Sequence, residues 1–355
     1  MFSRSNILAT TKRKLFSAQR HCCRAGAALL LVLGFVVLLS FLTAGILKNS
    51  RREMVWQASE SSRPQLEIAA RSALEATLAV IANFQSIDGA IYCPRQGWAD
   101  ALTLAGFEYV AKEDAWRFDD KTLIDVKFRD ESGRYALNKL SSSDLATLLV
   151  ALGVSTSDTD ALCACFADWI DSDDNASVNG AEIDDYDSDD ENDAIPPNRE
   201  LRDFSEIRYI KNFPEIFLDD NGNPNELYRL LENAVSLVAE SSRPNINTAT
   251  PAALKALVYE SGTDADAVTD YLEATNSISG TPNVFRNASD LSRASADGLA
   301  NKVSFGVQTL RITTTARRGA ASFTLDTLVS VSTTTAGSTS SPFKILEQTS
   351  NVIPE

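Results

Sequence analysis

Residues 27–47 read AALLLVLGFVVLLSFLTAGIL, a run of 21 residues without a charged side chain. At 1.5 Å of rise per residue, a helix of this length spans roughly 30 Å, the thickness of the hydrocarbon layer of a bilayer. The run therefore predicts one membrane-spanning helix. Because residues 1–26 carry six Lys and Arg side chains and no acid, we expect this head to stay in the cytoplasm and the rest of the chain to lie outside.

A secretory signal peptide is the first alternative for this run. The run is too long for the apolar region of a signal peptide, and its end (GILKNSRRE, residues 45–53) lacks a cut site of small residues. An uncleaved signal anchor remains a competing interpretation.

Composition limits the possible functions. The chain has 355 residues and a formal net charge of −15, which disfavours binding to the phosphates of nucleic acid. The only histidine, His21, lies in the basic head. The rest of the chain therefore offers no imidazole for a Ser–His or Cys–His pair or for a metal site. Classical hydrolases and zinc enzymes are not expected.

Three cysteines follow the apolar run, namely Cys93, Cys163 and Cys165. Cys163 and Cys165 stand two apart on a predicted helix and would point to different faces, so they would pair poorly with each other. A disulfide from Cys93 to one of them, and three buried thiols that act as small apolar side chains, are both open.

Helical periodicity continues beyond the membrane run to about Phe84, with an interruption at Pro64 that should kink or break the helix. The outer half of this helix needs a surface to pack against. Strand-like segments supply it at residues 107–110, 116–118 and 123–128, and again at 303–315 and 323–334, the last two joined by a predicted hairpin turn. The fold class is therefore α+β, with a long N-terminal helix on a small antiparallel sheet and a large, mostly helical insertion. The Ser- and Thr-rich residues from 336 onward predict a loose tail.

The middle of the chain contains an internal repeat, because residues 137–149 and 246–258 share one pattern. Each copy has an apolar residue, an asparagine (Asn138 or Asn247), an N-capping hydroxyl (Ser141 or Thr250) and an amphipathic helix. Segments 203–207 and 287–291 read as two further helix starts. Residues 245–249 (NINTA) also suggest a helix-hairpin-helix, a DNA-binding motif, but the glycine hairpin is missing and the surroundings are acidic.

Residues 168–193 hold twelve acids and no Lys or Arg, so their carboxylates repel one another unless cations intervene. Within them, residues 171–182 (DSDDNASVNGAE) have the spacing of a calcium-binding loop, although Ala176 replaces the usual glycine. Oxygen ligands favour Ca²⁺ over zinc or copper. We expect a structural role for one or two ions, and a solvated loop without an ion is the alternative. The predicted ligands are Asp171, Asp173, Asn175, Ser177, Asn179, Glu182 and Asp184.

Several motifs together resemble the minor pseudopilin K family of the type II secretion system. They are the basic leader that ends at Gly26, the apolar run after it, and the segments GRYALNKL (133–140), DWIDSD (168–173), GAE (180–182), PNREL (197–201) and INTA (246–249). The resemblance implies a pilin-like helix and sheet with a SAM-like helical insertion that binds calcium through its acidic loop. It also implies that prepilin peptidase cuts after Gly26, which makes Ala27 the new N-terminus.

The resemblance divides the chain as follows: a cleaved leader (1–26), a transmembrane helix (27–47), a stalk with the first strands (48–135), the inserted domain (136–300), the last strands (301–335) and a flexible tail (336–355). Most pseudopilins have Glu at the fifth position after the cut, where it neutralises the N-terminus of a neighbouring subunit. Here that position is Leu31. An unpaired ammonium group in lipid is costly, so a subunit without this Glu suits the tip of the filament.

The function implied is that of a non-enzymatic subunit that initiates and caps a pseudopilus for the export of folded proteins across the outer membrane. Its implied partners are the I- and J-type minor pseudopilins, prepilin peptidase and the secretion platform of the inner membrane, which the chain crosses once. Two other classes stay open. One is a signal-anchored periplasmic module that binds calcium and joins no filament. The other is a membrane-tethered hydrolase that uses carboxylates, for which the sequence offers no nucleophile–base pair.

Overall fold

The computed structural model describes residues 6–186, 195–259, 261–275, 280–319, 321–332 and 342–354. For residues 6–28, 30, 51–61 and 352–354 it describes the course of the backbone and not the side chains.

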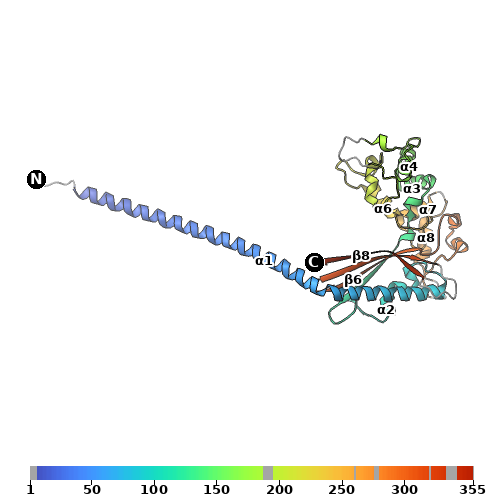
Figure 1. Ribbon diagram of the computed structural model, residues 1–355, viewed down its shortest axis with the longest axis horizontal. Helices are drawn as coiled ribbons and strands as arrows, with labels where there is room; N and C mark the ends of the chain where they lie inside the picture. Colours follow the sequence, from blue (N-terminus) through green and yellow to red (C-terminus); the bar gives the residue numbers. More distant parts are fainter. Residues whose placement is uncertain are drawn as a thin grey trace.

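The N-terminal helix α1 runs from Asn6 to Asp88 and contains 83 residues (Figure 1). Pro64 lies inside the helix and does not end it. Figure 1 shows the helix changing direction where it reaches the sheet, which agrees with the kink expected from a proline that removes one backbone hydrogen bond. Among the described side chains, Leu66 is the first of α1 to be buried. The helix therefore has a free membrane-proximal half and a packed outer half.

The outer half of α1 is buried against the sheet through residues spaced three and four apart. Leu66, Ala69, Ala70, Ala73 and Ile81 are fully buried, and the three alanines let the helix approach the sheet closely. They share one core with strand side chains that include Leu310, Ile312, Phe323 and Leu325. The predicted stalk and its support are thus one packed unit.

The sheet has six strands in the order β1-β2-β3-β6-β7-β8, and every neighbouring pair is antiparallel. Residues alternate along β6 between the core and the opposite, polar face, as expected when one face of a sheet is covered by a helix. The strand bounds are β1 Glu108–Val110, β2 Ala115–Arg117, β3 Leu123–Asp130, β6 Thr309–Arg318, β7 Ala321–Val331 and β8 Phe343–Pro354. The short helix α2, Ala101–Leu104, lies between α1 and β1.

The last strand corrects one expectation from the sequence. Phe343–Pro354 forms β8 and pairs along β7, from Phe343 opposite Val331 to Pro354 opposite Ala321, whereas a loose tail was expected from residue 336. The Ser/Thr richness that suggested a tail falls mainly on residues 333–341, which lie outside the described residues. The following segment extends the sheet by one edge strand, because it pairs with the open edge of β7.

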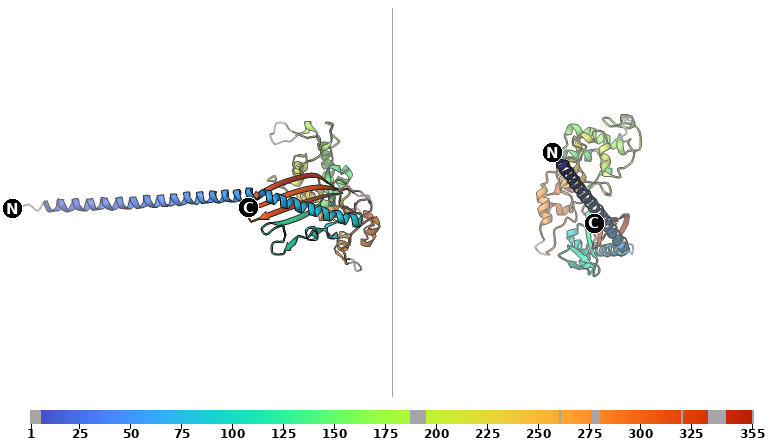
Figure 2. Two further views of the ribbon diagram at one scale, coloured as in Figure 1. Left: turned by 60° about the horizontal axis from the view of Figure 1, so that its bottom comes forward. Right: turned by 90° about the vertical axis from the view of Figure 1, so that its left-hand side faces the viewer.

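The chain leaves the sheet after Asp130 and returns at Thr309, and these two positions lie on neighbouring strands β3 and β6. The residues between them form the predicted helical insertion, which Figure 2 shows beside the sheet and away from the N-terminus. The fold class expected from the sequence is therefore confirmed. The elements of the insertion are α3 Ser142–Leu152, α4 Thr156–Ile170, α5 Phe213–Phe217, α6 Glu226–Ala234, α7 Pro251–Val258 and α8 Ala265–Glu273, with a two-stranded parallel sheet of β4 Tyr135–Ala136 and β5 Val235–Ser236.

The internal repeat recurs in three dimensions as two units with separate apolar cores. In the first unit, the amide of Asn138 exchanges two hydrogen bonds of 3.0 Å with the backbone of Leu201. In the second unit, Asn247 makes the same reciprocal pair with the backbone of Phe285, at 2.8 and 2.7 Å. Each asparagine thus holds the segment that precedes the later 3-10 helix of its unit, Phe204–Tyr209 or Ala288–Ala294.

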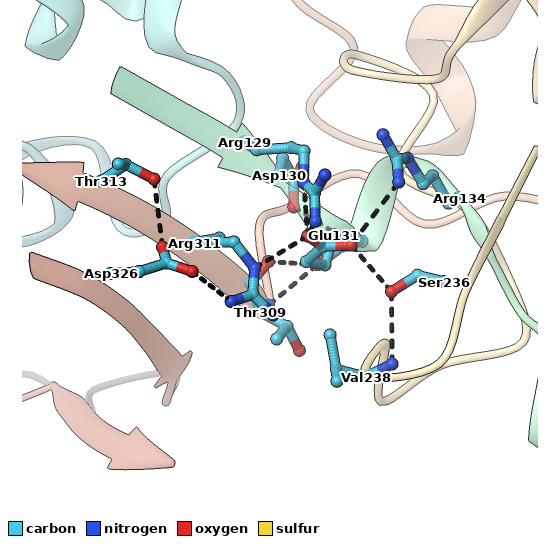
Figure 3. A network of polar contacts seen from close by, with 11 residues as sticks. Arg129, Asp130, Glu131, Arg134, Ser236, Val238, Thr309, Arg311, Thr313 and Asp326 are labelled. Carbon is cyan, nitrogen blue, oxygen red and sulfur yellow. Dashed lines mark hydrogen bonds and ion pairs between the residues drawn. The ribbon is translucent and has the colours of Figure 1, made fainter. Parts of the chain in front are cut away.

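A buried carboxylate joins the sheet to the insertion (Figure 3). Glu131 follows directly after β3, and 2% of its side chain is exposed. Its Oε1 pairs with Arg129 at 2.6 Å and with Arg311 of β6 at 3.4 Å, while its Oε2 accepts a hydrogen bond of 2.8 Å from Ser236 of β5. Because one acid binds groups from both parts, the insertion is fixed relative to the sheet.

Candidate metal centre

The acidic loop brings three carboxylates together at the end of α4. Asp168 lies in the last turn of the helix and Asp171 caps it, with the Asp171 N–H donating to the carbonyl of Ala167 at 3.0 Å. Glu182 comes from the far side of the loop. One oxygen from each of Asp168, Asp171 and Glu182 lies within 4.8 Å of the others.

Asp168 is fully buried and is held by one residue of the loop. Ser177 donates from its backbone N–H to Oδ2 at 3.0 Å and from its hydroxyl to Oδ1 at 2.5 Å. These bonds fold the loop back over the end of α4. Gly180 passes so close to the Asp168 carboxylate that a Cβ at this position would overlap it, so the tight turn of the loop requires glycine here.

Glu182 provides the strongest indication of a cation. Its side chain is only 3% exposed, yet neither Oε1 nor Oε2 has a hydrogen-bond partner among the residues that the structure describes. Burial first, and then the negative charges of Asp168 and Asp171, raise the pKa of the Glu182 carboxyl. Burial likewise raises the pKa of Asp171. A buried carboxylate without donors is unfavourable unless a cation replaces the lost hydration.

The triad fits a hard divalent cation. Calcium binds six to eight oxygens at about 2.3–2.6 Å, so oxygens on opposite sides of the ion are about 5 Å apart, a spacing that matches the triad. Carboxylate oxygens are also the ligand type that such cations prefer. The chain can therefore hold a metal here with Asp168, Asp171 and Glu182.

Two of the other predicted ligands, Asp173 and Asp184, lie outside this group of carboxylates. Asp173 uses its Oδ1 to accept hydrogen bonds from the backbone and side chain of Asn175, at 2.9 and 2.7 Å. Asn179 adopts a left-handed backbone with φ 69°, and its carbonyl faces the thiol of Cys165 at 3.6 Å. Asp184 is exposed. Ser177 acts on Asp168, as described above.

Two residues at this site were missed by the calcium-loop pattern. That pattern starts at Asp171, so it left out Asp168, one helical turn earlier, whose burial is seen only in the structure. The second is Asn198, whose Nδ2 donates to the carbonyl of Asp173 and to Oδ1 of Asp174, at 3.1 and 2.9 Å. Within the described part of the chain, the Oδ1 of Asn198 is buried and has no partner.

The far end of the loop is tied to the insertion core. Asp185 pairs with Lys211 at 3.3 Å, and the ring of Tyr186 lies 5.6 Å from that of Trp169. Burial raises the pKa of the Tyr186 hydroxyl to about 12, so this group stays neutral while it accepts the N–H of Lys211 at 3.1 Å. The remaining acids, residues 187–193, lie outside the described residues.

The predicted processing and assembly residues lie in α1. Gly26 and Ala27 belong to the part for which only the backbone is described, and that backbone is helical. Leu31 is 64% exposed. Within the described residues, one helix is long and apolar enough to cross a membrane, over Leu31–Ser50, and none of that stretch is buried. This finding fits a single membrane span or a signal anchor.

Part of the insertion is similar to a known protein family. Residues 127–219 match the family described as type II secretion system (T2SS), protein K. The matched residues include the end of β3, most of the first repeat unit and the metal triad. Over these residues, about a quarter of its length, the chain is similar to the type II secretion system protein K family. Its members are pseudopilins, which are structural subunits rather than enzymes.

The fold of this chain is found in a solved structure. A chain from the crystal structure of the GspK-GspI-GspJ complex of the enterotoxigenic Escherichia coli type 2 secretion system is 17% identical to this chain, with a TM-score of 0.57. The match covers 83% of this chain and 99% of the other. No curated protein matches this chain.

Proposed function

We propose that this chain is the minor pseudopilin at the tip of the pseudopilus, where it initiates and caps assembly for the export of folded proteins across the outer membrane. One observation carries this proposal: the insertion emerges from the end of the sheet that is farthest from the membrane. Gln85, in the last turns of α1, donates to the carbonyl of Ser332 at 2.6 Å, so β7 ends at the end of the sheet that is farthest from the membrane. Leu310 pairs with Val329 of β7 and with Asp130 of β3. The chain therefore enters and leaves the insertion at this same end of the sheet.

The position of the insertion has a consequence for stacking. In a filament of membrane-anchored subunits, the next subunit toward the tip would have to occupy the space that the insertion fills. Leu31 adds a second argument, because it provides no carboxylate to neutralise the N-terminus of a subunit ahead, and an unpaired ammonium in lipid is costly. Both features favour the leading position.

We further propose that the I- and J-type minor pseudopilins bind this chain. The related chain was crystallised with GspI and GspJ, and the described apolar side chains of the membrane-proximal half of α1 are exposed, so they are free to pack against the helices of other subunits. The anchor would lie in the inner membrane, with the sheet and insertion in the periplasm, after prepilin peptidase has cut between Gly26 and Ala27.

We assign Ca²⁺ to the acidic triad, with a structural role. Asp168, Asp171 and Glu182 would hold the ion, and the neighbouring Asp173, Asn175, Asn179, Asp184 and Asn198 offer further oxygens nearby. The ion would offset the repulsion between the carboxylates and fix a loop that has little apolar content of its own.

The position in the filament can be tested by labelling. Pseudopili assembled from the full set of subunits, with a small epitope at the C-terminus of this chain, should carry gold label at one end only in electron micrographs. An epitope on the major subunit serves as the control and should label the whole shaft. Repeated label of this chain along the shaft would refute the proposal.

A further inference from the structure

The joint at Pro64 lies where α1 meets the sheet. A proline has no N–H, so the carbonyl four residues earlier loses its helical hydrogen bond, and the helix bends at this point more easily than elsewhere. Figure 1 shows the change of direction here. Gln65 is the next residue, and Leu66 is the first of the described side chains of α1 to be buried. The free half and the packed half of α1 therefore meet directly at the proline.

Arg318, at the end of β6, contacts the first packed turn of α1. Its Nη1 donates to the Oε1 of Gln65 at 3.1 Å. Its Nη2 donates to the Oδ2 of Asp119 at 2.8 Å. Its Nε and Nη2 both donate to the hydroxyl of Thr122, at 3.0 and 2.8 Å. One guanidinium thus connects α1, β6 and the turn between β2 and β3.

The acceptors on the sheet side are themselves held in place. Thr122 is only 1% exposed. The Oδ1 of Asp119 accepts the backbone N–H groups of Lys121 and Thr122, each at 2.8 Å, and its Oδ2 accepts the Thr122 hydroxyl at 3.0 Å. Because a guanidinium presents its donors in a rigid planar fork, these fixed acceptors also set the direction of the nitrogen that reaches Gln65. Arg318 can therefore orient the start of the packed half of α1.

We propose that Arg318 is a latch for the joint at Pro64, which fixes the direction in which the membrane-proximal half of α1 leaves the sheet. With the latch released, the joint allows a range of directions. The side chains of Arg318 and Asp119 are 25% and 42% exposed, and exposed ion pairs contribute little to the free energy of unfolding. The latch therefore acts on the angle of the helix more than on the stability of the fold. It depends neither on the metal nor on the proposed position at the tip.

The experiment measures the distance between two spin labels by pulsed electron paramagnetic resonance, on the full chain in lipid nanodiscs. Labels at Ser50→Cys and Lys127→Cys report on the free half of α1 and on an exposed position of β3. Residue 50 lies about 21 Å before Pro64 along the helix, so a turn of about 20° at the joint moves it by about 7 Å. The three cysteines after the membrane run are buried, and Cys22 and Cys23 are replaced by serine. A chain without the two added cysteines gives the background signal.

The parent should show one narrow distribution of distances. Gln65→Met, which removes only the acceptor on α1, and Arg318→Met should each broaden this distribution or shift its centre by several ångström. Arg117→Met removes an ion pair of 3.0 Å between β2 and β1; it is the matched control and should keep the parent distribution. Pro64→Ala should abolish the effect of Gln65→Met, because a helix without the proline has no joint to release.

Parent-like distributions in both Gln65→Met and Arg318→Met would overturn the proposal. An equal change in Arg117→Met would do so too, because it would indicate a general loosening of the sheet. The same holds if the effect of Gln65→Met persists in combination with Pro64→Ala. Gln65 is exposed, so its substitution should not prevent folding, and the test stands even if Arg318→Met fails to fold.

Discussion

Ser177 binds both carboxylate oxygens of Asp168, with its N–H at 3.0 Å from Oδ2 and its hydroxyl at 2.5 Å from Oδ1. A residue in an exposed loop is thereby connected to a buried acid at the end of α4. This connection places the returning part of the loop, which carries Glu182, beside α4. The geometry of the metal centre therefore depends on Asp168 as much as on the residues of the calcium-like pattern.

We predict that Asp168→Asn removes most of the stabilisation by calcium. The change keeps the shape of the side chain but deletes one of three negative charges that would bind the ion. At free Ca²⁺ a hundredfold above Kd, the parent should gain about 2.7 kcal/mol, read as a rise in melting temperature of several degrees by calorimetry. Asp220→Asn, in an exposed loop elsewhere in the insertion, is the control and should respond like the parent. A parent protein whose melting is the same with calcium and with chelator would contradict the metal assignment.

The second prediction concerns pH. The pKa of Glu182 is raised in the folded protein by burial and by its acidic neighbours, so without metal the folded state binds this proton more tightly than the unfolded chain does. Stability of the chelated protein should therefore increase as the pH is lowered from 7 toward 5. With calcium present the gain from the ion should shrink over the same range, because protons compete for the carboxylates.

Glu182→Gln isolates this effect, because the amide does not titrate. Thermal melts of the chelated variant should vary less with pH than those of the parent between pH 5 and 7. If parent and variant show the same pH profile, Glu182 does not carry the effect.

Processing gives the third prediction. Gly26→Val should leave the chain uncut when prepilin peptidase is co-expressed, because a branched side chain would block the cleavage site implied by the family resemblance. Immunoblots of the membrane fraction should then show a precursor that is longer than the mature chain by the 26 leader residues. Gly34→Val, in the same apolar helix with open space around the added carbon, should be cut normally. A parent chain that is not shortened would instead favour a signal anchor.

The repeat provides a fourth prediction, on stability. Asn247 is buried, and its side chain exchanges hydrogen bonds with Phe285 and donates another to the carbonyl of Phe305 at 2.8 Å. Asn138 makes only the first kind of pair, with Leu201. Since each buried group left unpaired costs about 1–3 kcal/mol, Asn247→Ala should lower the free energy of unfolding by about 3 kcal/mol and Asn138→Ala by about 2 kcal/mol. Urea unfolding measures both losses. A larger loss for Asn138→Ala than for Asn247→Ala would contradict this prediction.

Much of the architecture could be predicted from periodicity alone. The apolar run and its helical continuation gave α1, the alternating segments gave the core strands, and the repeated apolar-Asn-x-x-hydroxyl pattern gave both helical units. These features depend on residues close in sequence, which is why they can be read from it. Pro64 was expected to kink or break the helix, and α1 continues through it without a break.

The features that were missed depend on residues far apart in the chain. Asp168 becomes a candidate ligand only when Glu182 is folded against it. β8 forms because β7 offers a free edge, which no local pattern at residues 343–354 reveals. The junction at Glu131 requires arginines and a serine from three separate segments. Sequence patterns predict helices and strands well, whereas a site formed between them can be recognised only in the tertiary structure.

The neighbouring positions of Asp130 and Leu310 have an evolutionary consequence. Adjacent strands lie about 4.8 Å apart, so a segment of almost any length can enter and leave at this point as an ordinary hairpin turn would. A simpler ancestor with a plain turn here could have acquired the whole insertion in one genetic event without any change to its strands.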